Sequence, residues 1–139
     1  MLARMSATEA WLKAFLHRHD AVAGTVHVTL PDDGDMLALH AAVGIPPRVQ
    51  KITARVPRGK GMAGLALERG EPVSTCNLQT DETGDVRPGA RAVAAQAAVA
   101  LPVQRDGVVA VVGMAWMDDR ELPESLLEQL AKDAASVAL

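Results

Sequence analysis

The pattern of apolar and polar positions predicts a helix at each end of the chain. Ser6 and Glu9 form a capping box, and the apolar residues after them recur at helical spacing, so we expect a helix over residues 7–19. Near the other end Pro123 marks a helix start, and we expect this second helix to continue to the end of the chain. Its wide apolar stripe consists of Leu126, Leu127, Leu130, Ala131, Ala134, Val137 and Ala138.

Between these helices, alternation with a period of two predicts strands. The first covers residues 22–30 and the second residues 36–43, and the Asp-Gly pair between them is typical of an antiparallel hairpin. Residues 96–104 and 108–117 are apolar on both faces and are joined by another Asp-Gly pair. Strands that are covered on both faces have this pattern, so we expect these two to form the middle of the sheet.

Proline and glycine divide the rest of the chain into short elements. We expect a helical turn and a weak strand over residues 48–56, a short helix over residues 62–69, and a short strand over residues 72–75. Residues 77–95 have the composition of a loop. This order of elements predicts one α+β domain over residues 1–139, built on a central antiparallel sheet.

Composition narrows the classes of function. The chain has 139 residues, 49% hydrophobic and 22% charged, as expected of one soluble domain. Its single cysteine excludes an internal disulfide and a cysteine-based metal cluster. A net charge of -3 and 2% aromatic residues argue against nucleic-acid binding. The first apolar run contains Lys, His and Arg, unlike a signal peptide, and we expect a cytoplasmic protein that does not bind membranes.

A glycine-rich run raises the question of dinucleotide binding. Residues 59–64 read GKGMAG and match G-x-G-x-x-G. However, Pro57 and Arg58 interrupt the preceding strand, and no further βα units follow from which a parallel sheet could grow. We therefore reject a dinucleotide-binding fold.

The wider frame resembles a GAF domain, a small-molecule-binding sensory module of signalling proteins, from about Thr8 to Leu139. Three motifs carry the resemblance: P-x-G-x-G-x-x-G-x-A from Pro57, G-x-P-V from Gly70, and ALPV-x-x-D-G from Ala100. The resemblance implies a GAF-like, profilin/PAS-like antiparallel sheet. Both terminal helices would cover one face, and short helices and loops would lie over a pocket on the other.

The GAF fold also hosts free methionine-(R)-sulfoxide reductases, which work through several cysteines. By resemblance, Ala63 stands where these enzymes carry a cysteine of the glycine motif, and the loop that holds their other reactive cysteines has none here. We expect Cys76 to be a small side chain packed at the end of a strand. We therefore predict that the protein is not an enzyme and has no catalytic residue and no cofactor.

Basic residues suggest the class of ligand. Arg48 to Lys60 holds five cations and no acid ahead of a glycine-rich helix start, where free amides favour anions, although such a run is also typical of a solvated surface. The long loop, which is where binding residues concentrate, supplies further polar groups. We expect a small anion or acidic metabolite as ligand, bound by Asn77, Asp81, Arg87, Arg91 and Gln96.

Two histidines fall on the first hairpin. If Asp33-Gly34 forms the turn, residues whose numbers sum to 67 lie opposite one another, which pairs His27 with His40 on one face. Two imidazoles could bind a metal, but the neighbouring residues offer no third ligand. We therefore interpret them as an ordinary cross-strand pair and expect no metal.

These observations favour a sensory or regulatory GAF domain that binds a small molecule in signal transduction and reports to a separate signalling protein. The alternative is a dimerisation or interaction module with a filled pocket, because the small residues of AVAAQAAVA could either leave or close a cavity. The first helix is apolar on two sides, with Trp11 and Phe15 on one and Leu12 and Leu16 on the other. This surplus predicts a homodimer through the terminal helices.

Overall fold

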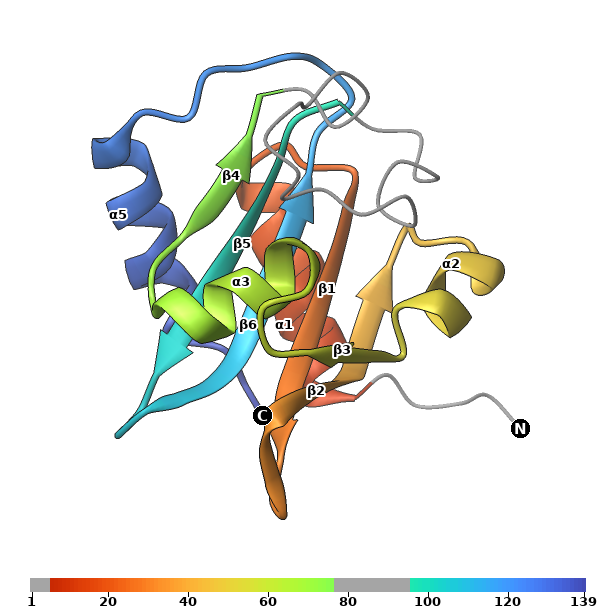
Figure 1. The fold of residues 1–139 in the computed structure, drawn as a ribbon. Coiled ribbons are helices and arrows are strands. Elements are labelled where there is room, and N and C mark those ends of the chain that lie inside the picture. The colour runs from red at the N-terminus through yellow and green to blue at the C-terminus, as the bar shows by residue number, and fades with distance from the viewer. Residues whose placement is uncertain (1–5, 77–95) are drawn as a thin grey trace.

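The computed structural model describes residues 6–76 and 96–139. A six-stranded sheet has the order β3-β2-β1-β6-β5-β4, and all its neighbouring strands are antiparallel (Figure 1). The elements are α1 (Ala7–Arg18), β1 (Ala23–Leu30), β2 (Asp33–Val43), α2 (Pro47–Ile52), β3 (Arg55–Pro57), α3 (Gly61–Arg69), β4 (Val73–Thr75), β5 (Ala98–Gln104), β6 (Val108–Ala115) and α5 (Glu124–Ala134).

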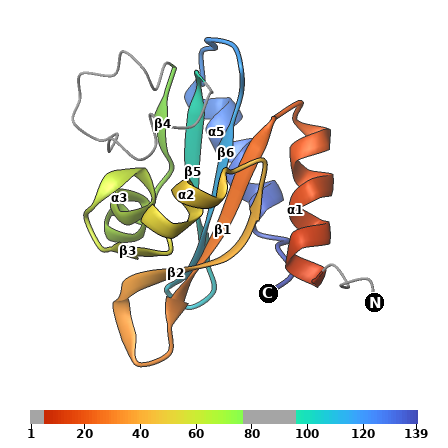
Figure 2. The ribbon, with the colours of Figure 1, turned by 90° about the vertical axis from the view of Figure 1, so that its right-hand side faces the viewer.

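The terminal helices α1 and α5 lie on one face of the sheet and α3 lies on the other, as Figure 2 shows. This confirms the α+β fold class and the predicted placement of the helices. The element order is also as predicted, and Ser6 caps α1 by accepting a hydrogen bond from the backbone N–H of Glu9.

The main core fills the space between the sheet and the terminal helices. Phe15 is fully buried and stacks on Trp11 with 4.8 Å between ring centroids. Leu12 and Leu16 are buried beside it, and Leu130 of α5 completes the contact. Burying each large apolar side chain contributes about 1.5–3 kcal/mol. The apolar surface of α1 that motivated the dimer prediction is thus mostly covered by the chain's own core.

The last helix ends earlier than the sequence predicts. The prediction that α5 continues to the end of the chain is wrong, because the helix stops at Ala134 and residues 135–139 are not helical. Val137 is buried there, and the Arg105 guanidinium donates to the carbonyls of Ala135 and Val137. The burial of Val137 and the hydrogen bonds from Arg105 to these carbonyls offset the helical hydrogen bonds that are lost when the helix ends.

The centre of the sheet is formed by β1 and β6, whereas the sequence placed β5 and β6 there. This prediction was half right. β5 is apolar on both faces because α3 and α5 cover it, although its outer neighbour is only the short strand β4.

The register of the first hairpin also differs from the prediction. His27 lies opposite Leu39, and His40 is an extra residue at a bulge between the pairs Val26–Ala41 and His27–Leu39. The predicted His27–His40 pair is therefore wrong: His27 is buried and His40 is exposed. The ladder has two register shifts, at Val26/His27 and next to the turn at Thr29/Leu30, and only the pairs between them are displaced by one position. Beyond the bulge, Gly24–Val43, Thr25–Ala42 and Val26–Ala41 are paired as predicted.

Candidate functional site

At one end of the sheet, the face opposite the terminal helices carries only small side chains. Paired residues of antiparallel strands project side by side on the same face, so the register gives rows across the sheet. The first row consists of Ala23, Ala115, Ala98 and Thr75. The second consists of Ala42, Thr25, Gly113 and Ala100, with Val73 as its last member on the edge strand β4. We call these two rows without Val73 the small-residue floor.

The floor is bounded by a row of larger residues. The next row consists of Leu39, His27, Val111 and Pro102. Val111 lies in the cluster that packs under α3, as does Ala100 of the floor. Within the floor Gly113 has no room for a side chain, because a Cβ there would lie 2.7 Å from Thr25 Oγ1. The side chains of this face are therefore small at one end of the sheet and larger at the other, and His27 lies where the two parts meet.

His27 is the buried polar group of this boundary. His27 is only 3% exposed. Its Nε2 atom lies 2.8 Å from the carbonyl oxygen of Thr53, the residue that follows α2. A carbonyl only accepts hydrogen bonds, so Nε2 carries the proton and Nδ1 presents a lone pair. Among the described residues Nδ1 has no hydrogen-bond partner. A buried acceptor without a donor is costly, and such groups mark sites that require an explanation.

Burial also fixes the charge of this ring. Desolvation lowers the pKa of His27 below its ordinary value of 6.5, and the hydrogen bond to Thr53 opposes this only in part. The imidazole is therefore neutral at neutral pH: its N–H is bonded to Thr53, and its acceptor nitrogen has no partner in the part of the chain that the structure describes.

The carbonyl that binds His27 is positioned by α2. Val49 is buried and anchors this short helix, and the Thr53 hydroxyl donates to the Val49 carbonyl at 2.9 Å. Gln50 Nε2 donates to the Ile45 carbonyl at 2.9 Å and ties the helix to its own entry turn. His27 thus fastens the end of α2 over the sheet face that carries the floor.

One of the five predicted ligand-binding residues lies within the described residues. Gln96 is half-buried two positions before Ala98, and its backbone N–H donates to the Trp116 carbonyl at 2.7 Å, which places it beside the small-residue floor. The other four lie outside the described residues: Asn77, Asp81, Arg87 and Arg91.

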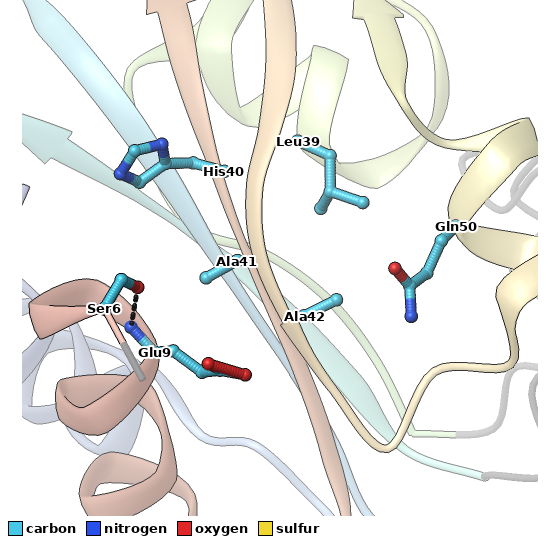
Figure 3. Close-up of a pocket in the computed structure, with 7 residues that line it drawn as sticks. All are labelled: Ser6, Glu9, Leu39, His40, Ala41, Ala42 and Gln50. Atoms are coloured by element: carbon cyan, nitrogen blue, oxygen red, sulfur yellow. Dashed lines mark hydrogen bonds between the residues drawn. The ribbon is translucent and has the colours of Figure 1, made fainter. Parts of the chain in front are cut away.

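A cleft lies at the edge of the sheet. It is an open cleft of about 280 Å³, and Figure 3 shows that it straddles β2, with Ala41 on the α1 side and Ala42 on the α2 side. β3 pairs with β2 only along Met36–Ala38, which leaves the rest of that strand edge uncovered by β3. The remaining lining residues are Ser6, Glu9, Leu39, His40 and Gln50. Ser6 and Gln50 are already engaged in local hydrogen bonds, so this cleft is the weaker candidate.

The glycine-rich run has a structural role. Gly59 and Gly61 adopt positive φ angles of 80° and 65°, and a Cβ on Gly64 would lie 2.3 Å from the Pro57 carbonyl oxygen. The Gly59 N–H donates to the Gly64 carbonyl at 2.8 Å. These glycines are needed to fold the turn before α3, which accounts for the motif without a bound phosphate.

The basic side chains around this turn, between Arg48 and Lys60, lie on the surface of the protein. Arg48, Lys51, Arg55, Arg58 and Lys60 are all exposed. Arg58 pairs with Asp35 at 2.6 Å. The solvated-surface interpretation therefore accounts for these residues as they stand.

Cys76 lies one residue past β4, as expected for a strand end, but it is exposed rather than packed. Within residues 6–76 and 96–139, no group of three His, Cys, Asp or Glu side chains could hold a metal ion. No helix in the same part of the chain is long and apolar enough to cross a bilayer.

Comparison with known proteins places this geometry in a family. A search of curated proteins found no match. Among solved structures, the GAF domain of an Acinetobacter phosphoenolpyruvate-protein phosphotransferase is similar, with a TM-score of 0.69, 16% identity, and coverage of 97% of this chain and 83% of that one. The type II free methionine-R-sulfoxide reductase of Thermoplasma acidophilum has a TM-score of 0.71 at 14% identity, covering 91% and 83%.

A third similar structure is a Staphylococcus aureus NreA protein mutated in its nitrate binding site, with a TM-score of 0.66, 18% identity, and coverage of 84% of this chain and 89% of that one. At these identities each likeness shows the fold alone. The family profile described as GAF domain matches residues 9–139. The chain therefore belongs to the GAF domain family.

Proposed function

We propose that this chain is a sensory GAF domain that binds a small molecule over the small-residue floor and acts in signal transduction. The observation that carries the proposal is the buried Nδ1 of His27, an acceptor that has no donor among the described residues and lies at the boundary of a floor of small side chains. Pockets for small molecules combine apolar walls with a few convergent polar groups, and the floor with His27 and Thr25 has this character.

The proposal does not include catalysis. The chain has one cysteine, Cys76, whereas the reductase mechanism considered above needs several thiols. A single thiol can be oxidised to a sulfenic acid, but it has no second thiol in the chain to resolve it. Turnover of free methionine-(R)-sulfoxide with a thiol reductant that is lost in Cys76→Ser would contradict this part.

The alternative remains an interaction module with no ligand, formed as a homodimer through the terminal helices. The half-buried residues Leu126 and Leu127 of α5 are the apolar surface available for such a contact. The two functions differ in one observable, since only the sensory domain is stabilised by a small molecule.

A thermal-shift screen of anions, nucleotides, amino acids and small amides tests the proposal. A ligand that binds only the folded state stabilises it by RT ln(1 + [L]/Kd), so the melting temperature rises with the logarithm of the ligand concentration once that concentration exceeds Kd. Ala115→Leu fills the floor at a half-buried position and should abolish the shift, whereas Ala10→Leu on the exposed side of α1 is the matched control. A ligand that still stabilises Ala115→Leu binds elsewhere, and the absence of any ligand favours the interaction module. Native mass spectrometry of protein from its own host extends the search to ligands outside the screen.

A further inference from the structure

The chemistry of the free groups beside the floor restricts what can bind there. Nδ1 of His27 accepts and does not donate, because the Thr53 carbonyl holds the ring proton on Nε2. Thr25 lies two residues earlier on the same face, about 7 Å away along the strand. Its hydroxyl has no hydrogen-bond partner among the described residues, so it can donate to a ligand or accept from one. The site therefore offers one fixed acceptor and one adaptable hydroxyl.

We propose that the ligand is an uncharged small molecule that donates an N–H or O–H hydrogen bond to Nδ1 of His27 and places a second polar group at the hydroxyl of Thr25. A primary carboxamide or a small alcohol has this combination of donor and acceptor. This inference rests on the proposed function, and it replaces the anion that the basic residues suggested.

An anion with only acceptor atoms fits the same groups poorly. Its lone pairs would face the lone pair of Nδ1, and the ring would have to take up a proton to donate in return. The buried surroundings of His27 oppose that proton, as the direction of its pKa shows. The residues beside the ring in its row, Leu39 and Val111, carry no charge that would stabilise an imidazolium.

A ligand at Nδ1 would also act on α2. The atom is shielded from solvent, so the chain over it must move for the ligand to enter. Thr53, at the end of α2, is the described residue that hydrogen-bonds the same ring, so entry of the ligand and the position of α2 would be coupled through His27. Buried polar groups that are satisfied only by the correct ligand give strong discrimination against analogues that lack the donor.

Isosteric probe pairs test the class of ligand. Acetamide and acetate have nearly the same shape, and so do urea and nitrate, but only the first of each pair carries N–H donors. These four probes join the thermal-shift panel with larger amides, polyols, amino acids and nucleosides, and affinities of the binders are measured by calorimetry. We expect donor-bearing compounds to bind and acceptor-only anions not to bind.

Two matched variants identify the acceptor. In His27→Gln the side-chain amide nitrogen can still donate to the Thr53 carbonyl, but the amide oxygen is bonded to the same carbon as that nitrogen and does not occupy the position of Nδ1. Binding should therefore weaken about tenfold while folding is kept. His17→Gln makes the same substitution at an exposed position of α1 and should bind as wild type. In the wild-type protein, the ¹⁵N resonance of Nδ1 should move on binding, which needs no variant and would not follow from a structural role alone.

The outcomes distinguish a failure of the proposed ligand class from a failure of the proposed function. A donor-bearing ligand that loses affinity in His27→Gln and shifts the Nδ1 resonance supports the inference. If the binders are acceptor-only anions, or if they bind His27→Gln as well as wild type with an unmoved Nδ1 resonance, the inference fails and the sensory function stands. If nothing in the panel binds and the protein from its host carries no small molecule, the proposed function fails and the inference falls with it.

Discussion

Gly64→Ala tests whether the glycine-rich run is a structural turn. A Cβ at this position would lie 2.3 Å from the Pro57 carbonyl oxygen and 3.2 Å from the Gly59 nitrogen, both backbone atoms that cannot swing aside. Relief requires the start of α3 to move away from the turn, which strains the hydrogen bond from the Gly59 N–H to the Gly64 carbonyl. Overpacking costs about 1–3 kcal/mol and a lost hydrogen bond about 0.5–1.5 kcal/mol.

Alanine has a higher helix propensity than glycine, which stabilises the folded state by about 1 kcal/mol. The expected net loss is therefore about 1–3 kcal/mol, which lowers the melting temperature by about 3–10 °C for a domain of this size. Thermal unfolding followed by circular dichroism measures it. Gly34→Ala is the control, because a Cβ there meets no atom within 4 Å and its melting temperature should not fall. If Gly64→Ala is as stable as wild type, the close approach is not what requires glycine, and a ligand role for the run must be reconsidered.

Three further predictions concern the core, the buried imidazole and the assembly. Phe15→Ala should destabilise the fold by about 3–5 kcal/mol, because it empties a fully buried position, and chemical denaturation would show a shift of that size. The folded-state pKa of His27 lies below 6.5, so the unfolded chain binds its proton first and stability should fall as pH drops below about 6.5 toward the folded pKa. The difference in melting temperature between wild type and His27→Gln across this range isolates the effect, and a constant difference contradicts it. Light scattering should give twice 14.6 kDa at micromolar concentration, with Leu127→Glu shifting the protein to a monomer, and a monomeric wild type refutes the dimer.

The elements of the fold could be predicted because each has a local signal. The capping box at Ser6 lies where the sequence places it, and α3 ends at Arg69 as predicted, with the left-handed Gly70 directly after it. Such caps depend on a few neighbouring residues. The end of α5 could not be predicted in this way. It depends on the contact of Arg105, about 30 residues away in the chain, with the carbonyls of the tail.

The candidate site had a weaker signal. The run of alanines around Gln96 indicated that small residues would either leave or close a cavity, but hydrophobic patterning reports polarity and not volume. The floor becomes visible only when Ala98 and Ala100 are placed beside Ala115 and Gly113, which requires the register of β5 and β6. Thr25 joins it through β1, from the other end of the sequence.

His27 shows how irregularities in the register of one hairpin decided the chemistry. With a regular hairpin, His27 and His40 would share a face, and two imidazoles side by side could exchange a proton or begin a metal site. The bulge at His40 moves that ring to an exposed edge and leaves His27 opposite Leu39, in apolar surroundings. Bulges re-aim side chains in this way and are common beside functional sites. The Thr53 carbonyl keeps the ring proton on Nε2, and with the second imidazole at the exposed bulge the lone pair of Nδ1 has no donor among the described residues. This lone pair is what selects a hydrogen-bond donor.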